Sequence, residues 1–195
     1  MDMPKKNTIK LNPHLHQIAY AQACSLANQA NAAQKAIGTN HQVHDVLTFL
    51  VLSGLSMELY FKAIMLAARN GEVTKGHELS KLYNEFPRFL TDNLNTVYLS
   101  DQKSISLPIT VIAMVQRKDK PEKPDKDLLG KGFSDFENAI KSVSNIFTRA
   151  RYFFEEIGEE YTYIEYPVGQ ISSLIKSLDK TYNSFINGEF KGAVA

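Results

Sequence analysis

Residues 46–68 read VLTFLVLSGLSMELYFKAIMLAA, and this stretch decides the fold. Glu58 and Lys62 are its only charged residues, so a helix formed here would be apolar almost all round. Such a helix is buried, either in the core of a helical bundle or in a membrane. The run is long enough to span a bilayer, but each central charge would cost roughly 2.5–3.5 kcal/mol there. The sequence therefore predicts the central helix of a bundle over residues 41–69, and no membrane span.

The segment before this helix has the features of a second long helix with one narrow face. Asn12 and Pro13 are residue types favoured at an N-cap and in the first helical turn, and Gly38 is favoured just after a helix end. We therefore expect a helix over residues 13–37. Its small side chains would allow another helix to approach closely; they are Ala23, Ala27, Ala30 and Ala33. Cys24, the single cysteine, lies among them, and we interpret it as a buried spacer.

A third helix is expected after a short loop over residues 71–76. Its apolar residues recur at helical spacing, and Pro87 should break or kink it; they are Leu79, Leu82, Phe86 and Phe89. Residues 105–115 are apolar and β-branched, and we favour a helix that begins at Pro108 over a short strand. Residues 117–131 read RKDKPEKPDKDLLGK, a composition typical of an exposed, mobile loop.

Two amphipathic helices are predicted in the last third of the chain. Apolar residues recur at steps of three and four between residues 133 and 157, and again between residues 168 and 185, which is typical of helices in a bundle. Residues 161–166 should form an extended connector, and residues 1–10 and 189–195 should be frayed. The predicted fold is all-α: one domain over residues 1–195, an antiparallel bundle of five to six helices with a long mobile loop.

The composition sets limits on location and chemistry. The chain has 195 residues, of which 44% are hydrophobic, and a formal net charge of +1, so no general basic field would draw it to nucleic acid. One cysteine makes no internal disulfide, and no cysteine or histidine spacing predicts a metal site or another cofactor. The polar, basic first residues are not followed by an apolar core, so we expect no secretory signal and a cytoplasmic location.

Glu58 and Lys62 are the most informative polar residues. They lie four apart on one face of the most apolar helix, where a buried charge must be paired. One interpretation is a simple ion pair on a narrow wet stripe, and the other is a polar network at the edge of the bundle. Arg151 is the natural additional partner, because it flanks the apolar face of the helix over residues 133–157. His77, just before the third helix, could cap that helix or act as a general acid or base.

Three blocks of the chain together resemble the higher eukaryote and prokaryote nucleotide-binding (HEPN) superfamily. They are SGLSMELYFKAIMLAARNG at residues 53–71, GHELSKLYNEF at residues 76–86 and FTRARYFFEE at residues 147–156. Many bacterial members look like S-x-E-L-Y-x-K-A, then G-H-x-L-x-x-L, then R-Y-x-x-E. The matching positions here are Ser56, Glu58, Leu59, Tyr60, Lys62 and Ala63; Gly76, His77, Leu79 and Leu82; and Arg151, Tyr152 and Glu155.

The resemblance implies a helical, often dimeric module with ties to RNA cleavage, nucleotide binding, toxin–antitoxin systems or phage defence. Catalytic members carry an arginine and, four to six residues later, a histidine. Arg69 and His77 are separated by seven residues and by Asn70-Gly71, so the usual pair is missing. We therefore expect a module that binds a nucleotide, RNA or protein partner rather than an enzyme. Its expected polar network comprises Glu58, Lys62, His77, Arg151, Tyr152 and Glu155.

Two alternatives remain open beside that expectation. One is a metal-independent ribonuclease that uses His77 with Arg69 or Arg151. The other is a purely structural protein that dimerises through apolar helix faces. In either case the resemblance implies a homodimer.

Overall fold

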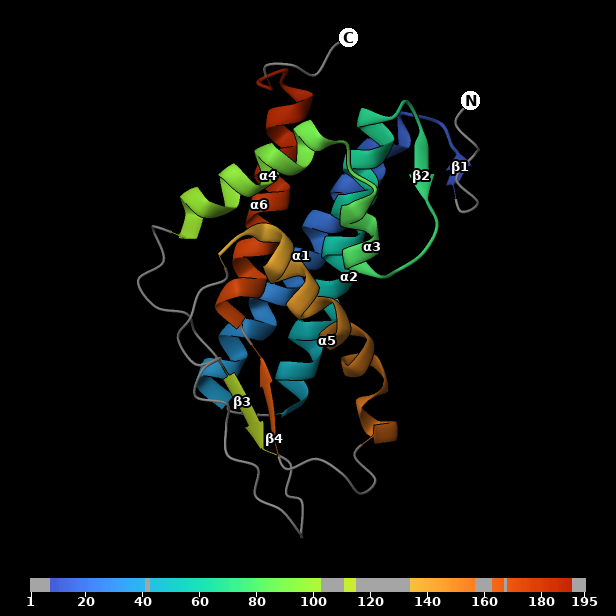
Figure 1. Cartoon of the computed structure of the whole chain (residues 1–195). Helices are drawn as coiled ribbons and strands as arrows, with labels where there is room; N and C mark the ends of the chain where they lie inside the picture. The colour runs from blue at the N-terminus through green and yellow to red at the C-terminus, as the bar shows by residue number, and fades with distance from the viewer. Residues whose placement is uncertain are drawn as a thin grey trace.

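The structure, a computed structural model, describes residues 8–40, 43–102, 111–114, 134–156, 163–166 and 168–190. The described part contains six helices and four short strands (Figure 1). The helices are α1 (Leu15–Asn40), α2 (Val43–Ala68), α3 (Leu79–Asn84), α4 (Arg88–Gln102), α5 (Phe136–Glu156) and α6 (Val168–Ile186). The strands are β1 (Thr8–Lys10), β2 (Glu72–Thr74), β3 (Val111–Met114) and β4 (Tyr163–Tyr166). The prediction of an all-α helical bundle is confirmed.

Helix α2 is the centre of the bundle. It runs antiparallel to α1 and also packs against α3, α5 and α6 (Figure 1). Its segment His44–Ala68 is long and apolar enough to cross a membrane by length and composition, but 72% of its most apolar window is buried inside the fold. Phe49, Phe61 and Ile64 are fully buried against the neighbouring helices. Burial of this kind is typical of a core helix, which is the role predicted from residues 46–68.

Helix α1 begins as expected and ends later than expected. The Asn12 side chain accepts a hydrogen bond from the His14 backbone N–H (3.0 Å), which satisfies one of the free donors at the helix start. Ala23, Ala27, Ala30 and Ala33 are all buried, so the alanine face does bring α1 and α2 together. The predicted stop at Gly38 is wrong, since α1 continues to Asn40. A glycine in a helix interior costs only about 1 kcal/mol, which packing against α2 offsets.

Pro87 separates α3 from α4, as predicted. The ring of proline fixes φ and removes the backbone donor, so it ends one helix and suits the start of the next. The Leu90 N–H donates to the Pro87 carbonyl at 2.9 Å, so Pro87 starts the first turn of α4. The resulting bend directs α4 across α6 instead of along α2 (Figure 1).

Two segments expected to be helical or frayed are strands. Val111–Met114 forms β3, which pairs antiparallel with β4, so the helix favoured for residues 105–115 is wrong over these four positions. Residues 161–166 were expected to be extended, and β4 agrees. Thr8–Lys10 forms β1, which pairs with β2, so these residues are not frayed. The expected mobile loop over residues 117–131 lies outside the described residues.

Gly71 makes the β1–β2 junction tight. Its φ of 88° lies in the left-handed region, and its carbonyl accepts a hydrogen bond from the Leu11 N–H at 2.9 Å. A Cβ atom added to Gly71 would lie 2.2 Å from the Leu11 carbonyl oxygen. At the other end of the described chain, Phe190 packs on Phe185 with ring centroids 6.0 Å apart, so the expectation of a frayed terminus fails at residue 190.

We expect Gly54→Ala to lower the free energy of unfolding by up to about 2 kcal/mol. A Cβ atom at Gly54 would lie 2.5 Å from Cγ of Phe147, a buried ring on α5. Overpacking of this kind costs about 1–3 kcal/mol, and the better helix propensity of alanine returns about 1 kcal/mol. Urea denaturation followed by circular dichroism measures the change.

The control for this substitution is the pair Gly54→Ala and Phe147→Leu in one chain. The smaller side chain at position 147 should make room, so the double variant should be more stable than the sum of the two single effects. Simple additivity would show that the Phe147 ring does not cause the loss.

Candidate functional site

Three of the predicted polar residues meet at the surface edge of α2. Lys62 donates a hydrogen bond to Oε1 of Glu58 at 2.6 Å, and Nδ1 of His77 lies 2.8 Å from the same oxygen. The Glu58 side chain is only 10% exposed, whereas those of Lys62 and His77 are 23% and 68% exposed. A buried carboxylate therefore holds two groups that reach solvent. We call Glu58, Lys62 and His77 the Glu58 group.

The hydrogen bond to Glu58 fixes the state of the His77 ring. An ionised carboxylate can only accept hydrogen bonds, so Nδ1 of His77 carries the proton that is donated to Glu58. In the neutral ring, Nε2 is then the acceptor, and it belongs to a side chain that is mostly exposed. This arrangement resembles the carboxylate–histidine pairs in which the carboxylate sets the tautomer and the second nitrogen meets a ligand.

Local backbone geometry brings His77 to α2. Gly76 has a φ of 125°, a conformation that residues with a side chain rarely adopt. Space around Gly76 is open, so the backbone angle and not crowding requires glycine at this position. The turn lets the chain leave β2 and place the next residue over Glu58 before α3 begins.

The arginines chosen from the sequence are placed differently. Arg69 lies 3.6 Å from a carboxylate oxygen of Glu72 and 3.9 Å from one of Glu85, so these acidic residues engage it at the end of α2. Arg151 lies in the last turns of α5, together with Tyr152 and Glu155. The side chains of these three residues lie outside the described part of the chain. The structure thus brings Glu58, Lys62 and His77 together. A contact between Arg151 and Glu58 remains a prediction.

A second polar group, which the sequence analysis did not select, surrounds Asp179 on α6. The hydroxyls of Tyr20 and Tyr60 donate to Oδ1 of Asp179 at 2.9 and 3.1 Å, and the Asn183 amide donates to the Tyr20 hydroxyl at 2.9 Å. Sγ of Cys24 lies 3.3 Å from the Tyr60 hydroxyl. Cys24 is half-buried and polar in its contacts, so its interpretation as a buried spacer is wrong. We call these five residues the Asp179 group.

Burial keeps the two tyrosines of this group protonated. It raises the pKa of Tyr60 far above its ordinary value, and the hydrogen bond with Cys24 and the charge of Asp179 raise it further. Burial is also the main reason that the pKa of Tyr20 is raised. Both hydroxyls therefore remain hydrogen-bond donors to the carboxylate at neutral pH.

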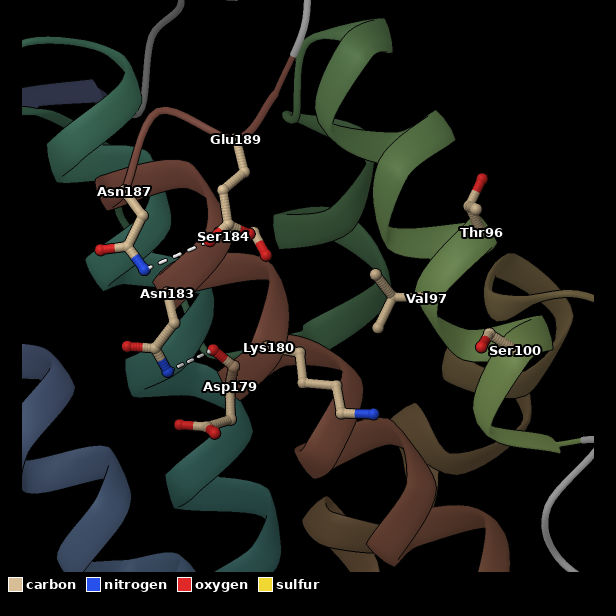
Figure 2. A pocket seen from close by; sticks show the side chains of 9 residues that line it. All are labelled: Thr96, Val97, Ser100, Asp179, Lys180, Asn183, Ser184, Asn187 and Glu189. Carbon is tan, nitrogen blue, oxygen red and sulfur yellow. Dashed lines mark hydrogen bonds between the residues drawn. The ribbon is translucent and has the colours of Figure 1, made fainter.

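Asp179 lies between two clefts on opposite sides of α6. Figure 2 shows the first, of about 400 Å³, between α4 and α6; Asp179 points toward α2 and Lys180 points toward α4. Lys180 donates to Oδ1 of the buried Asp101 on α4 at 2.5 Å. The second cleft, of about 470 Å³, lies between α1, α2 and α6. It is lined by Cys24, Ala27, Asn28, Asn31, Tyr60, Ser172, Ile175, Lys176 and Asp179.

The remaining observations concern metals and relatives. Within the described ranges, no group of three histidine, cysteine or acidic side chains could hold a metal ion. No protein-family model, curated protein or solved structure matches this chain. The function is therefore inferred from the chemistry of the Glu58 group and the Asp179 group.

Proposed function

We propose that this chain is a HEPN-like helical module that binds a nucleotide or RNA at the Glu58 group. One observation carries the proposal: residues from two separate blocks of the HEPN-like sequence meet on a single carboxylate oxygen. The resemblance grouped Glu58, Lys62 and His77 by motif alone. Their contact gives a physical reason why an acid, a lysine and a histidine occur at these three positions. A stress, toxin–antitoxin or phage-defence setting, and a cytoplasmic location, belong to the same proposal.

The chemistry of the Glu58 group suits a phosphate-bearing ligand. The ammonium of Lys62 and the imidazole of His77 can donate to phosphate oxygens, and both reach solvent. Glu58 holds them in place before a ligand arrives, which lowers the ordering cost of binding. Lys75 is exposed two residues before His77 and is a further positive charge in this segment.

Calorimetric titration with AMP, ATP and a short single-stranded RNA tests the proposal. We expect at least one of these to bind, and His77→Ala to weaken that binding about tenfold. His44→Ala is the matched control, because this histidine is also exposed (75%) but lies roughly 20 Å away along α2. The absence of binding by all three probes, or equal weakening in both variants, would overturn the proposal.

A metal-independent ribonuclease is the second candidate, and the His77–Glu58 hydrogen bond favours it. A neutral imidazole oriented by a buried carboxylate can take a proton from an attacking hydroxyl, and Nε2 is the free acceptor. Incubating labelled RNA with EDTA and either wild type or His77→Ala separates the two candidates. Cleavage that His77→Ala abolishes supports the enzyme; equal or absent cleavage in both ends it.

The dimer implied by the resemblance is also part of the proposal. Ile18 on α1 and Ile186 on α6 are 56% and 46% exposed, so they are candidate contact residues for a second copy of the chain. A purely structural, dimerising protein would need such apolar faces and no ligand. Light scattering that shows a monomer at high micromolar concentration would rule out both the dimer and this third alternative.

A further inference from the structure

The cleft between α1, α2 and α6 contains the carboxylate of Asp179, which makes no ion pair with any residue that the structure describes. Within the described part of the chain, the side chain of Asp179 is hydrogen-bonded by Tyr20 and Tyr60, with Cys24 at 3.9 Å, and all of these donors are neutral. Every one of these contacts ends on Oδ1. Asp179 lines the cleft, so its charge is available to a group that enters.

Lys180, which follows Asp179 on α6, is engaged elsewhere, and Lys176 lies at the wall of the cleft. Lys180 lies 2.5 Å, and Lys176 3.8 Å, from the same oxygen of Asp101. Asp101 is buried, so it holds the ammonium of Lys180 toward α4, while the ammonium of Lys176 lies 3.8 Å away, beyond hydrogen-bond distance. Asp179 therefore keeps a negative charge on the α1 side of α6, where an incoming cation would meet it.

The other residues of the cleft suit an ammonium group. Such a group has three N–H donors, and Asp179 can accept only part of them. The side-chain oxygens of Asn28, Asn31 and Ser172 line the same space and can accept the rest. Tyr60 also lines the cleft, where its hydroxyl donates to Oδ1 of Asp179 and holds the carboxylate in place.

We propose that this cleft binds a small molecule through a primary ammonium group, which the carboxylate of Asp179 receives. A volume of about 470 Å³ is within the usual range for small-molecule sites. The ammonium could belong to a simple amine or to an amino acid. In the second case Lys176, at the cleft wall, would face the carboxylate of the ligand.

Three probes distinguish these sources: n-butylamine, γ-aminobutyrate and 1-butanol, titrated into the full chain by calorimetry at neutral pH. We expect n-butylamine to bind and 1-butanol, its uncharged analogue, not to bind. Tighter binding of γ-aminobutyrate than of n-butylamine would assign the site to amino acids, and weaker binding would assign it to amines. Equal affinity for n-butylamine and 1-butanol would overturn the proposal.

Asp179→Asn provides the matched variant, because the amide oxygen can still accept the tyrosine hydroxyls while the charge is lost. We expect at least a tenfold loss of n-butylamine affinity, whereas Asp92→Asn, at an exposed position on α4, should change nothing. Asn31→Lys places a positive charge at an exposed position on the cleft wall and should also weaken binding. Unchanged affinity in Asn31→Lys would contradict the proposal even if Asp179→Asn failed to fold.

This site is independent of the nucleotide site at the Glu58 group. His77→Ala should leave n-butylamine binding unchanged, and Asp179→Asn should leave nucleotide binding unchanged. Either proposal can therefore fail without the other.

Discussion

Phe136→Ala is expected to lower the free energy of unfolding by about 3–5 kcal/mol, the range for removing a buried aromatic side chain. Phe136 is the first residue of α5 and is fully buried. Its ring lies 5.5 Å from Tyr83, 5.6 Å from Tyr98 and 6.4 Å from Phe61, measured between centroids. These partners belong to α3, α4 and α2, so a single ring joins four helices.

The loss should come from the ring and not from the start of α5. The Phe136 N–H donates to the Asn95 side chain at 3.0 Å, and this bond survives the substitution. Phe136→Leu, which keeps a large apolar side chain and leaves a smaller cavity, should therefore cost less than Phe136→Ala. Phe185→Ala is the control, since that ring is only half-buried. Chemical denaturation that gave equal losses for Phe136→Ala and Phe185→Ala would contradict this account of the core.

The helices could be predicted because their signals are local. The apolar run of α2, the alanine face of α1 and Pro87 before α4 each act through spacing within a few turns. Phe136 lies on the apolar face predicted between residues 133 and 157, and the described residues Phe136, Ile140, Val143 and Phe147 of that face are buried. Local periodicity therefore sufficed for the elements and for the residues that point into the core.

The pairing of the strands could not be predicted because it depends on partners far along the chain. Val111 pairs with Tyr166, and Thr8 pairs with Thr74. A short β-branched run reads equally well as a helix or a strand until the partner strand is known. The helix favoured for residues 105–115 was based on Pro108. Residues Val111–Met114 instead form a strand, because they pair with β4.

The Glu58 group and the Asp179 group also differ in how far apart in the sequence their contacting residues lie. Glu58 and Lys62 are four residues apart, so their contact follows from helix geometry, and the motif added His77. The Asp179 group joins α1, α2 and α6, and no local spacing connects Tyr20 or Tyr60 to α6. A signal in the sequence is that Asp179 lies four residues after Ile175 and three before Tyr182, so it borders the apolar face of α6.

Lys62→Met is expected to lower the free energy of unfolding by about 2 kcal/mol. The substitution keeps the apolar stem of the side chain but removes the charge that pairs with Glu58, whose side chain is only 10% exposed. Breaking a fully buried pair costs about 3–5 kcal/mol, because one charge is left without a partner. Here Lys62 is partly exposed and His77 still donates to Glu58, so the loss should be smaller.

Lys81→Met gives the matched comparison for this effect. Lys81 lies 2.6 Å from Glu78, the same distance as in the Lys62–Glu58 pair, but these side chains are 76% and 46% exposed. A pair in solvent contributes about 0–1 kcal/mol, so Lys81→Met should cost less than Lys62→Met because its partner carboxylate stays hydrated. Adding Glu58→Gln to Lys62→Met should restore part of the lost stability, because the unpaired charge disappears. Equal losses at Lys62 and Lys81, with no recovery in the double variant, would mean that Glu58 is solvated and exerts no hold on His77.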